Sequence, residues 1–196
     1  MSKILIVYGT TQGQTEKIAC RIKDELLSLG HNVSLFDNDK VFNSIDSRDF
    51  DAVIIGASVH LENYQRRLKK WVSVHAQILN HQPSAFFSVS LGVLQNETSV
   101  EEEVSKTVNE FLKSTSWKPR RYVIFAGALL YSKYNLISRW VMKCISKNAG
   151  GDTDTTKDYE YTNWDAVCRF AREFSSDIQS ESVINSKGSI KLTENI

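Results

Sequence analysis

The chain has 196 residues, with 24 Lys and Arg against 23 Asp and Glu, and 41% of the residues are hydrophobic. This length and balance fit one globular domain with a core of ordinary size, and the net charge of +1 argues against a dedicated nucleic-acid binder. The three cysteines, Cys20, Cys144 and Cys168, lie far apart. They indicate neither a disulfide framework nor a zinc site, so we expect a reducing, cytoplasmic setting.

The apolar segments of the chain argue against export and against a membrane span. Residues 4–8 form an apolar run that is shorter than the apolar region of a signal peptide. The longest apolar-leaning run, residues 122–131, contains a glycine and has about half of the ~20 residues that a spanning helix needs. We therefore expect no membrane-spanning helix.

Short apolar runs alternate with segments of helical periodicity along the whole chain. The runs that we expect to be strands are residues 4–8, 33–36, 52–55, 85–89 and 122–126. Most of them are almost continuously apolar, as is typical of parallel strands with both faces covered. Apolar stripes at helical spacing begin at Ile18, Leu68, Val100 and Trp164. The alternation predicts an α/β fold, a doubly wound five-stranded parallel sheet.

The segment between the fifth strand and the last helix, residues 129–162, is too long for an ordinary connection. Its first part carries four Lys and Arg but no acid, and Arg139, Lys143 and Lys147 recur every four residues opposite an apolar stripe. We expect an amphipathic helix that is too short to span a bilayer and that docks on an anionic membrane surface. Alternatively, the apolar stripe packs on the sheet or on a second subunit.

The composition changes near the end of the chain. Residues 179–196 are rich in Ser, Asn, Lys, Glu and Thr with scattered aliphatic residues. We expect this segment to be a poorly ordered tail. The sequence thus predicts one domain over residues 1–178, which includes the insertion at about 129–162.

The loop after the first strand, Gly9 to Thr15, is rich in hydroxyl and amide groups and leads directly into a helix. Backbone N–H groups at a helix amino terminus, together with Thr hydroxyls, form an anion site that a mononucleotide phosphate would fit. The loop lacks the Gly-Lys-Ser/Thr of a Walker motif and the three glycines of the dinucleotide fingerprint. The alternative is that these residues only cap the helix.

Residues Tyr8 to Glu16 resemble the FMN-phosphate loop of flavodoxins, which ends in Gly-x-Thr-Glu. The resemblance runs in order from about Lys3 to Ile178 and is sharper for one branch, the flavodoxin-like, quinone-dependent protoporphyrinogen dehydrogenases (protoporphyrinogen oxidases) of bacterial haem biosynthesis. The other segments that carry it are residues 55–59, 83–89, 126–129, 150–155, 161–164 and 170–173.

The resemblance implies noncovalent FMN as the cofactor. The residues that it places around the FMN phosphate are Thr10, Thr11, Gln12, Gly13, Gln14 and Thr15. Those that it places beside the isoalloxazine ring are Ala57, Ser58, Val59, His60, Ser88, Val89, Ser90 and Leu91. Both ring segments directly follow predicted strands, which is where ligands bind in open parallel sheets.

The reaction that the resemblance implies is oxidation of protoporphyrinogen IX to protoporphyrin IX, with menaquinone or ubiquinone as the acceptor, by a peripheral enzyme on the cytoplasmic side of the inner membrane. The alternatives are a flavodoxin-type electron carrier and an FMN-dependent quinone reductase. The loop at residues 91–96 has no aromatic residue and no acid, unlike that of a typical carrier, and this favours two-electron enzyme chemistry.

Few side chains are candidates for acid-base chemistry or substrate contacts. We expect no dedicated catalytic side chain and no metal. His60 could lie beside the flavin, whereas His75 falls on an apolar stripe and we expect it in the core. His31 and His81 flank strands and are expected at the surface. Lys133 and Arg139 are the candidates for the substrate propionates.

Overall fold

The computed structural model describes residues 1–38, 45–59, 64–91, 98–133 and 154–193. Its main sheet is parallel, with the strand order β2-β1-β3-β4-β5. The strands are β1 (Lys3–Gly9), β2 (Asn32–Asp37), β3 (Ala52–Ser58), β4 (Ser84–Ser90) and β5 (Arg121–Ala126). The predicted five-stranded, doubly wound sheet is confirmed.

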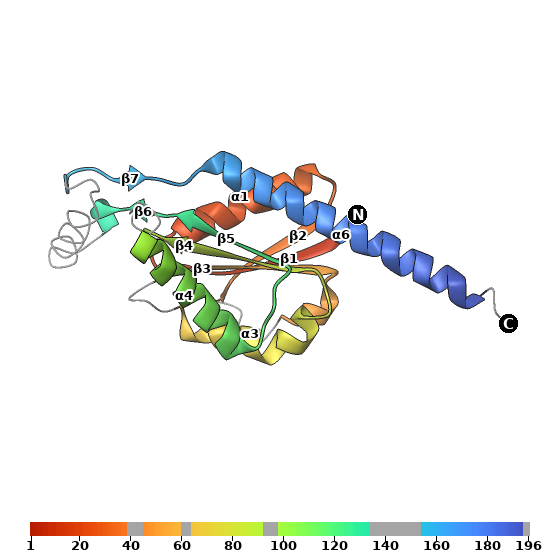
Figure 1. Ribbon diagram of the computed structural model, residues 1–196. Helices are drawn as coiled ribbons and strands as arrows, with labels where there is room; N and C mark the ends of the chain where they lie inside the picture. The colour runs from red at the N-terminus through yellow and green to blue at the C-terminus, as the bar shows by residue number, and fades with distance from the viewer. Residues whose placement is uncertain (39–44, 60–63, 92–97, 134–153, 194–196) are drawn as a thin grey trace.

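Helices cover both faces of this sheet. In Figure 1, α1 (Gln14–Ser28) and α6 (Trp164–Thr193) lie on one face, and α3 (Arg66–Leu79) and α4 (Thr98–Thr115) lie on the other. The short elements are the 3₁₀ turns η1 (Ser47–Asp49) and η3 (Tyr131–Lys133) and the strands β6 (Ala128–Leu129) and β7 (Tyr159–Glu160). Among the described helices, none is long and apolar enough to cross a membrane.

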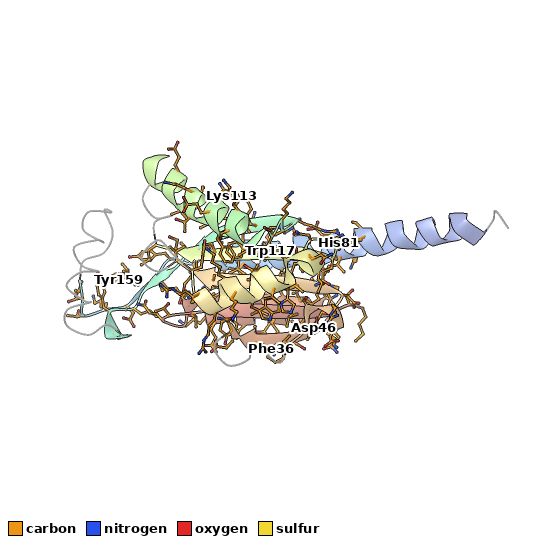
Figure 2. All side chains as sticks on the ribbon, turned by 90° about the horizontal axis from the view of Figure 1, so that it is seen from below. Phe36, Asp46, His81, Lys113, Trp117 and Tyr159 are labelled. Carbon is orange, nitrogen blue, oxygen red and sulfur yellow. The ribbon has the colours of Figure 1, made fainter. Side chains whose placement is uncertain are left out.

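Each face of the sheet has its own apolar core. The α1/α6 side buries Ile6, Ile22, Phe87 and Phe174 among others. The α3/α4 side buries Val53, Leu68, Trp71, Phe86 and Phe111, together with Trp117 (labelled in Figure 2), which follows α4. The Trp117 indole N–H donates to Ser84 Oγ at 3.0 Å, so its polar atom is satisfied where β4 begins.

A glycine in β3 makes room for one of the largest core side chains. Gly56 lies opposite Phe87 in the register of β3 and β4. A Cβ atom at Gly56 would lie 2.0 Å from Phe87 Cζ. The Phe87 ring is fully buried and packs near Phe125 and Phe170, with centroids 6.1 Å and 6.4 Å away. Close packing in this core therefore requires a residue without a side chain at Gly56.

The insertion begins and ends in paired backbone. β6 pairs antiparallel with β7, with Ala128 opposite Glu160 and Leu129 opposite Tyr159. Both strands extend beyond the end of β5 (Figure 1), and Tyr159 lies to one side of the sheet in Figure 2. The amphipathic helix expected to carry Arg139, Lys143 and Lys147 lies outside the described residues, so it stays a prediction.

The carboxyl-terminal segment differs from the expectation of a poorly ordered tail at residues 179–196. The last helix, α6, instead continues to Thr193 and projects beyond the sheet (Figure 1). No proline interrupts the segment, and a helix already anchored on the sheet extends at little cost because nucleation is complete. The low hydrophobicity of this segment therefore did not exclude a helix.

The histidines show one wrong prediction. His31, expected at the surface, is 6% exposed, and its Nε2 lies 2.8 Å from Ser175 Oγ in α6. Its burial depends on α6, which is distant in sequence. His75, expected in the core, is only half-buried and stacks on Trp71, with ring centroids 4.2 Å apart, while His81 is exposed as expected.

Candidate functional site

The carboxyl ends of β1, β3 and β4 meet at one edge of the sheet. Gly9 at the end of β1 is in register with Ala57 of β3, and Ser58 at the end of β3 is in register with Val89 of β4. Beyond the ladder, Val59 N–H donates to Val89 O at 3.0 Å. The loops predicted to surround a flavin are therefore brought together at the edge where open parallel sheets bind ligands.

The turn from β1 into α1 depends on the backbone of Gly13. Gly13 has φ of 96°, in the left-handed region that favours glycine. Its N–H donates to Thr10 Oγ1 at 2.9 Å, and its carbonyl accepts from Lys17 N–H at 3.1 Å. This geometry directs the first turn of α1 toward the sheet edge, where its N–H groups favour an anion.

Two side chains in the first turn of α1 contain buried oxygen atoms that have no hydrogen-bond partner among the described residues. Thr15 is fully buried and its Oγ1 is unpartnered; Gln14 is 6% exposed and its Oε1 is unpartnered. The Gln14 Nε2 donates to Thr162 Oγ1 at 2.8 Å. Buried polar groups are nearly always satisfied, so the Thr15 hydroxyl, which can donate, fits an anion bound at this turn.

The remaining predicted phosphate residues are more open. Thr11 is exposed, and Thr10 and Gln12 are half-buried. The loop thus has an exposed outer side and a buried end at Gln14 and Thr15. A phosphate group bound here would contact backbone and hydroxyl donors without a Lys or a metal, as the sequence predicts.

The predicted ring-flanking residues occupy the ends of β3 and β4. Ala57, Ser88 and Val89 are buried, and Ser58, Val59, Ser90 and Leu91 are half-buried. Leu91 approaches Gly127, where an added Cβ would lie 3.8 Å from Leu91 Cγ. His60 lies outside the described residues. Apart from His60, the structure brings these residues to the same edge as the α1 turn.

Two residues that the sequence reasoning missed tie this edge together. Tyr64 OH and Ser88 Oγ share a hydrogen bond of 2.8 Å, and the Tyr64 ring packs on Phe86 and Phe111, with centroids 5.6 Å and 4.7 Å away. Burial raises the pKa of Tyr64 to about 12. Its neighbour Gln65 donates from Nε2 to Ser58 Oγ at 3.1 Å. No local motif reveals these contacts, because they join segments that are apart in sequence.

One further phenol faces the first turn of α1. Tyr8 OH donates to Glu16 Oε1 at 2.9 Å, and burial together with this carboxylate raises the pKa of Tyr8 well above its usual value. Tyr8 therefore stays protonated at neutral pH. Among the described residues, no group of His, Cys, Asp and Glu side chains could hold a metal ion.

The two predicted propionate-binding residues belong to the insertion. Lys133 is the last residue of η3, which follows β6. The other limb of the insertion anchors this turn, because Ser132 N–H donates to Asp158 Oδ1 at 2.8 Å. Arg139 lies outside the described residues, so its place relative to the sheet edge is still a prediction.

The strand order and the glycine-containing loop that leads into α1 define a flavodoxin-like protein. The flavodoxin domain profile matches residues 5–156. Flavodoxin 1 from Bacillus cereus superposes with a TM-score of 0.54 at 13% identity, covering 89% of this chain and 98% of that one. An archaeal flavodoxin superposes with a TM-score of 0.52 at 14% identity, covering 90% and 99%. At these identities the two structures show the fold alone.

Two curated relatives are closer in sequence. The protoporphyrinogen IX dehydrogenase [quinone] of Escherichia coli K12 is 36% identical over 171 residues, 87% of this chain and 93% of the relative. The Leishmania major protein of the same name is 36% identical over 180 residues, 89% of this chain and 75% of the relative. The chain belongs to the flavodoxin domain family and, within it, to the protoporphyrinogen IX dehydrogenase [quinone] family. Its cofactor is FMN.

Proposed function

We propose that this protein oxidises protoporphyrinogen IX to protoporphyrin IX with FMN and a membrane quinone, in haem biosynthesis. The observation that carries the proposal is the 36% identity to the E. coli dehydrogenase over 93% of that enzyme's length. The geometry supports it, because the ends of β1, β3 and β4 form one continuous edge next to a helix turn suited to a phosphate.

Two groups of residues suit two different parts of FMN. The α1 turn, Thr10 to Thr15, would hold the phosphate, and the ends of β3 and β4 would flank the ring. Bound FMN supplies two-electron redox chemistry, so removing six electrons and six hydrogens from the substrate takes three cycles and converts three quinones to quinols. The protein itself would bind and orient protoporphyrinogen IX and the quinone.

The protonation state of Tyr64 makes this residue unsuited to act as a catalytic base. Tyr64 OH lies 2.8 Å from Ser88 Oγ of β4, and with a pKa of about 12 it stays neutral and hydrogen-bonded to Ser88. A neutral phenol in a buried hydrogen bond can orient a neighbour but does not remove a proton at physiological pH. We assign Tyr64 a positioning role.

The electrostatics near this edge suit a substrate with two propionates. Directly after Gln65, the first turns of α3 expose Arg66, Arg67, Lys69 and Lys70. The chain has no Asp or Glu from residue 63 to residue 96. Cations at a helix amino terminus interact unfavourably with the helix dipole. The stability of α3 therefore does not explain why these four cations are there. We propose that they attract the dianionic substrate and that Lys133 and Arg139 contact its propionates.

We also propose that the insertion docks on the cytoplasmic face of the inner membrane, where a quinone can reach the flavin. The four cations of residues 129–149 support this proposal. Wild-type protein should cosediment with anionic vesicles and be partly released by salt. The Arg139→Glu/Lys143→Glu variant should stay in the supernatant with its FMN retained, and equal binding of the two proteins would contradict membrane docking.

A comparison of acceptors tests the proposed reaction and separates it from the rival carrier function. Under anaerobic conditions, menaquinone or ubiquinone analogues should support porphyrin formation much faster than NAD(P)⁺, since the chain lacks a dinucleotide fingerprint. Equal rates with NAD(P)⁺ would contradict the quinone assignment. A redox titration that shows a strongly stabilised neutral semiquinone would favour the electron carrier instead.

A further inference from the structure

The Gln65 side chain occupies the junction between the phosphate loop and the ring-flanking strands. Gln65 immediately precedes α3, and its Nε2 reaches Ser58 Oγ at the end of β3. On its other side, the carboxamide packs against the backbone of Gly9 at the end of β1. A Cβ atom at Gly9 would lie 2.7 Å from Gln65 Oε1 and 3.0 Å from Gln65 Cδ. This contact is possible because Gly9 has no side chain.

The carboxamide has one satisfied end and one unsatisfied end. Its Nε2 is hydrogen-bonded to Ser58, whereas its Oε1 is buried and has no donor among the described residues. Leaving a buried acceptor without a donor costs about 1–3 kcal/mol, and native structures contain few such groups. With Nε2 donating to Ser58 Oγ, Oε1 is left as a buried acceptor for a donor that arrives with a ligand.

The position and polarity of Oε1 identify which part of FMN it suits. The phosphate belongs to the α1 turn and the ring to the ends of β3 and β4, so the ribityl chain has to pass between them. Gly9 and Ala57 are in register at this point of the sheet edge. A phosphate dianion offers no hydrogen-bond donor, whereas each ribityl hydroxyl does.

We propose that Gln65 is a cofactor-binding residue whose Oε1 accepts a hydrogen bond from a ribityl hydroxyl of FMN. The proposal rests on the FMN site argued above. It also gives Gly9 a specific role, since a side chain at Gly9 would displace the Gln65 carboxamide. Gln65 thereby selects for the sugar-alcohol chain of the cofactor, independently of the phosphate loop.

The test measures binding of FMN and of its 2′-, 3′- and 4′-deoxyribityl analogues by flavin fluorescence quenching. Wild-type protein should bind one deoxy analogue about 3- to 10-fold more weakly than FMN, as expected for one neutral hydrogen bond. In Gln65→Leu, the affinity for FMN should fall by this same 3- to 10-fold factor. The variant should then bind FMN and that deoxy analogue equally well. In Gln65→Glu, which keeps an acceptor at this position, the penalty should persist. Gln77→Leu, at an exposed position of α3, is the matched control and should behave as wild type.

The outcomes separate this proposal from the proposed function. If Gln65→Leu binds FMN as tightly as wild type, or if the deoxy penalties are unchanged in it, the Gln65 assignment is wrong while the FMN site stands. If wild-type protein binds no FMN, both fail. Thermal unfolding of the apo-proteins checks folding, and if Gln65→Leu is unfolded, Gln65→Met provides the same comparison. A penalty that disappears in Gln65→Glu as well would also overturn the acceptor role.

Discussion

Gln14 Nε2 donates a buried hydrogen bond of 2.8 Å to Thr162 Oγ1, and Thr162 in turn donates to Ala126 O at 2.9 Å. The first turn of α1 is thereby joined to the end of β5 and to the segment that leads from the insertion into α6. Further along the two helices, Arg172 Nε donates to Glu25 Oε1 at 2.7 Å. The turn that we assign to the FMN phosphate is therefore held by the base of the insertion.

Thr162→Val should weaken this connection and reduce both stability and FMN affinity. The substitution leaves the buried Gln14 Nε2 without its acceptor, which costs about 1–3 kcal/mol. We expect a lower free energy of unfolding in urea and a several-fold weaker FMN affinity. Thr156→Val is the matched control, because the Thr156 hydroxyl binds Asp154 in an exposed turn. Equal FMN affinity in Thr162→Val and wild type would show that the first turn of α1 does not depend on Thr162.

Substitutions in the phosphate loop should affect FMN and riboflavin differently. Thr15→Ala removes a buried hydroxyl and should weaken FMN binding by about 1–3 kcal/mol, since a hydrogen bond to a charged group is lost. The affinity for riboflavin, which lacks the phosphate, should change little in this variant. Thr11→Ala, at an exposed position, should have a smaller effect, and Gly13→Val a larger one, because Gly13 has φ of 96°. Unchanged FMN affinity in Thr11→Ala, Thr15→Ala and their double mutant would refute the phosphate assignment.

The strands, the fold class and the turn from β1 into α1 could be predicted because their signals are local. Continuous apolar runs mark buried parallel strands, and Gly13 with its neighbouring Thr residues marks the turn into α1. Tyr64 and Gln65 could not be found, because their partners Ser88 and Ser58 lie in other strands and become neighbours only in the folded sheet. His31 was misplaced for the same reason.

Gly56→Ala should destabilise the protein through overpacking. The new methyl group would lie 2.0 Å from Phe87 Cζ, in a core where the ring cannot move freely. We expect a loss of about 3 kcal/mol in the free energy of unfolding. Phe87→Leu removes part of the ring's volume, so the Gly56→Ala/Phe87→Leu double mutant should be more stable than the sum of the single effects implies. Strict additivity of the two substitutions would rule out this steric explanation.

His31 should make stability depend on pH below neutrality. Burial, followed by repulsion from the amino-terminal ammonium group, lowers the pKa of His31 from its ordinary 6.5 in the folded state. The unfolded chain therefore takes up the proton first. The contribution of His31 to stability is full above about pH 6.5 and is lost as the pH falls toward the lower folded-state pKa.

Urea unfolding at pH 7.5 and pH 5.5 tests this dependence. Wild type should lose more stability over this range than His31→Gln, which can still hydrogen-bond Ser175 but does not titrate. His81→Gln, at an exposed position, should follow wild type. If wild type and His31→Gln lose stability equally, the titration of His31 is not responsible.

The most direct test of the proposed function is the anaerobic stoichiometry of the reaction with FMN-loaded protein, protoporphyrinogen IX and a quinone analogue. Porphyrin fluorescence and quinol absorbance should rise together in a ratio of one protoporphyrin to three quinols, and Gly13→Val, which we expect not to retain FMN, should give neither product. Porphyrin formation at the same rate with Gly13→Val, or none with the FMN-loaded wild-type protein, would contradict the assignment of this protein as an FMN-dependent protoporphyrinogen dehydrogenase.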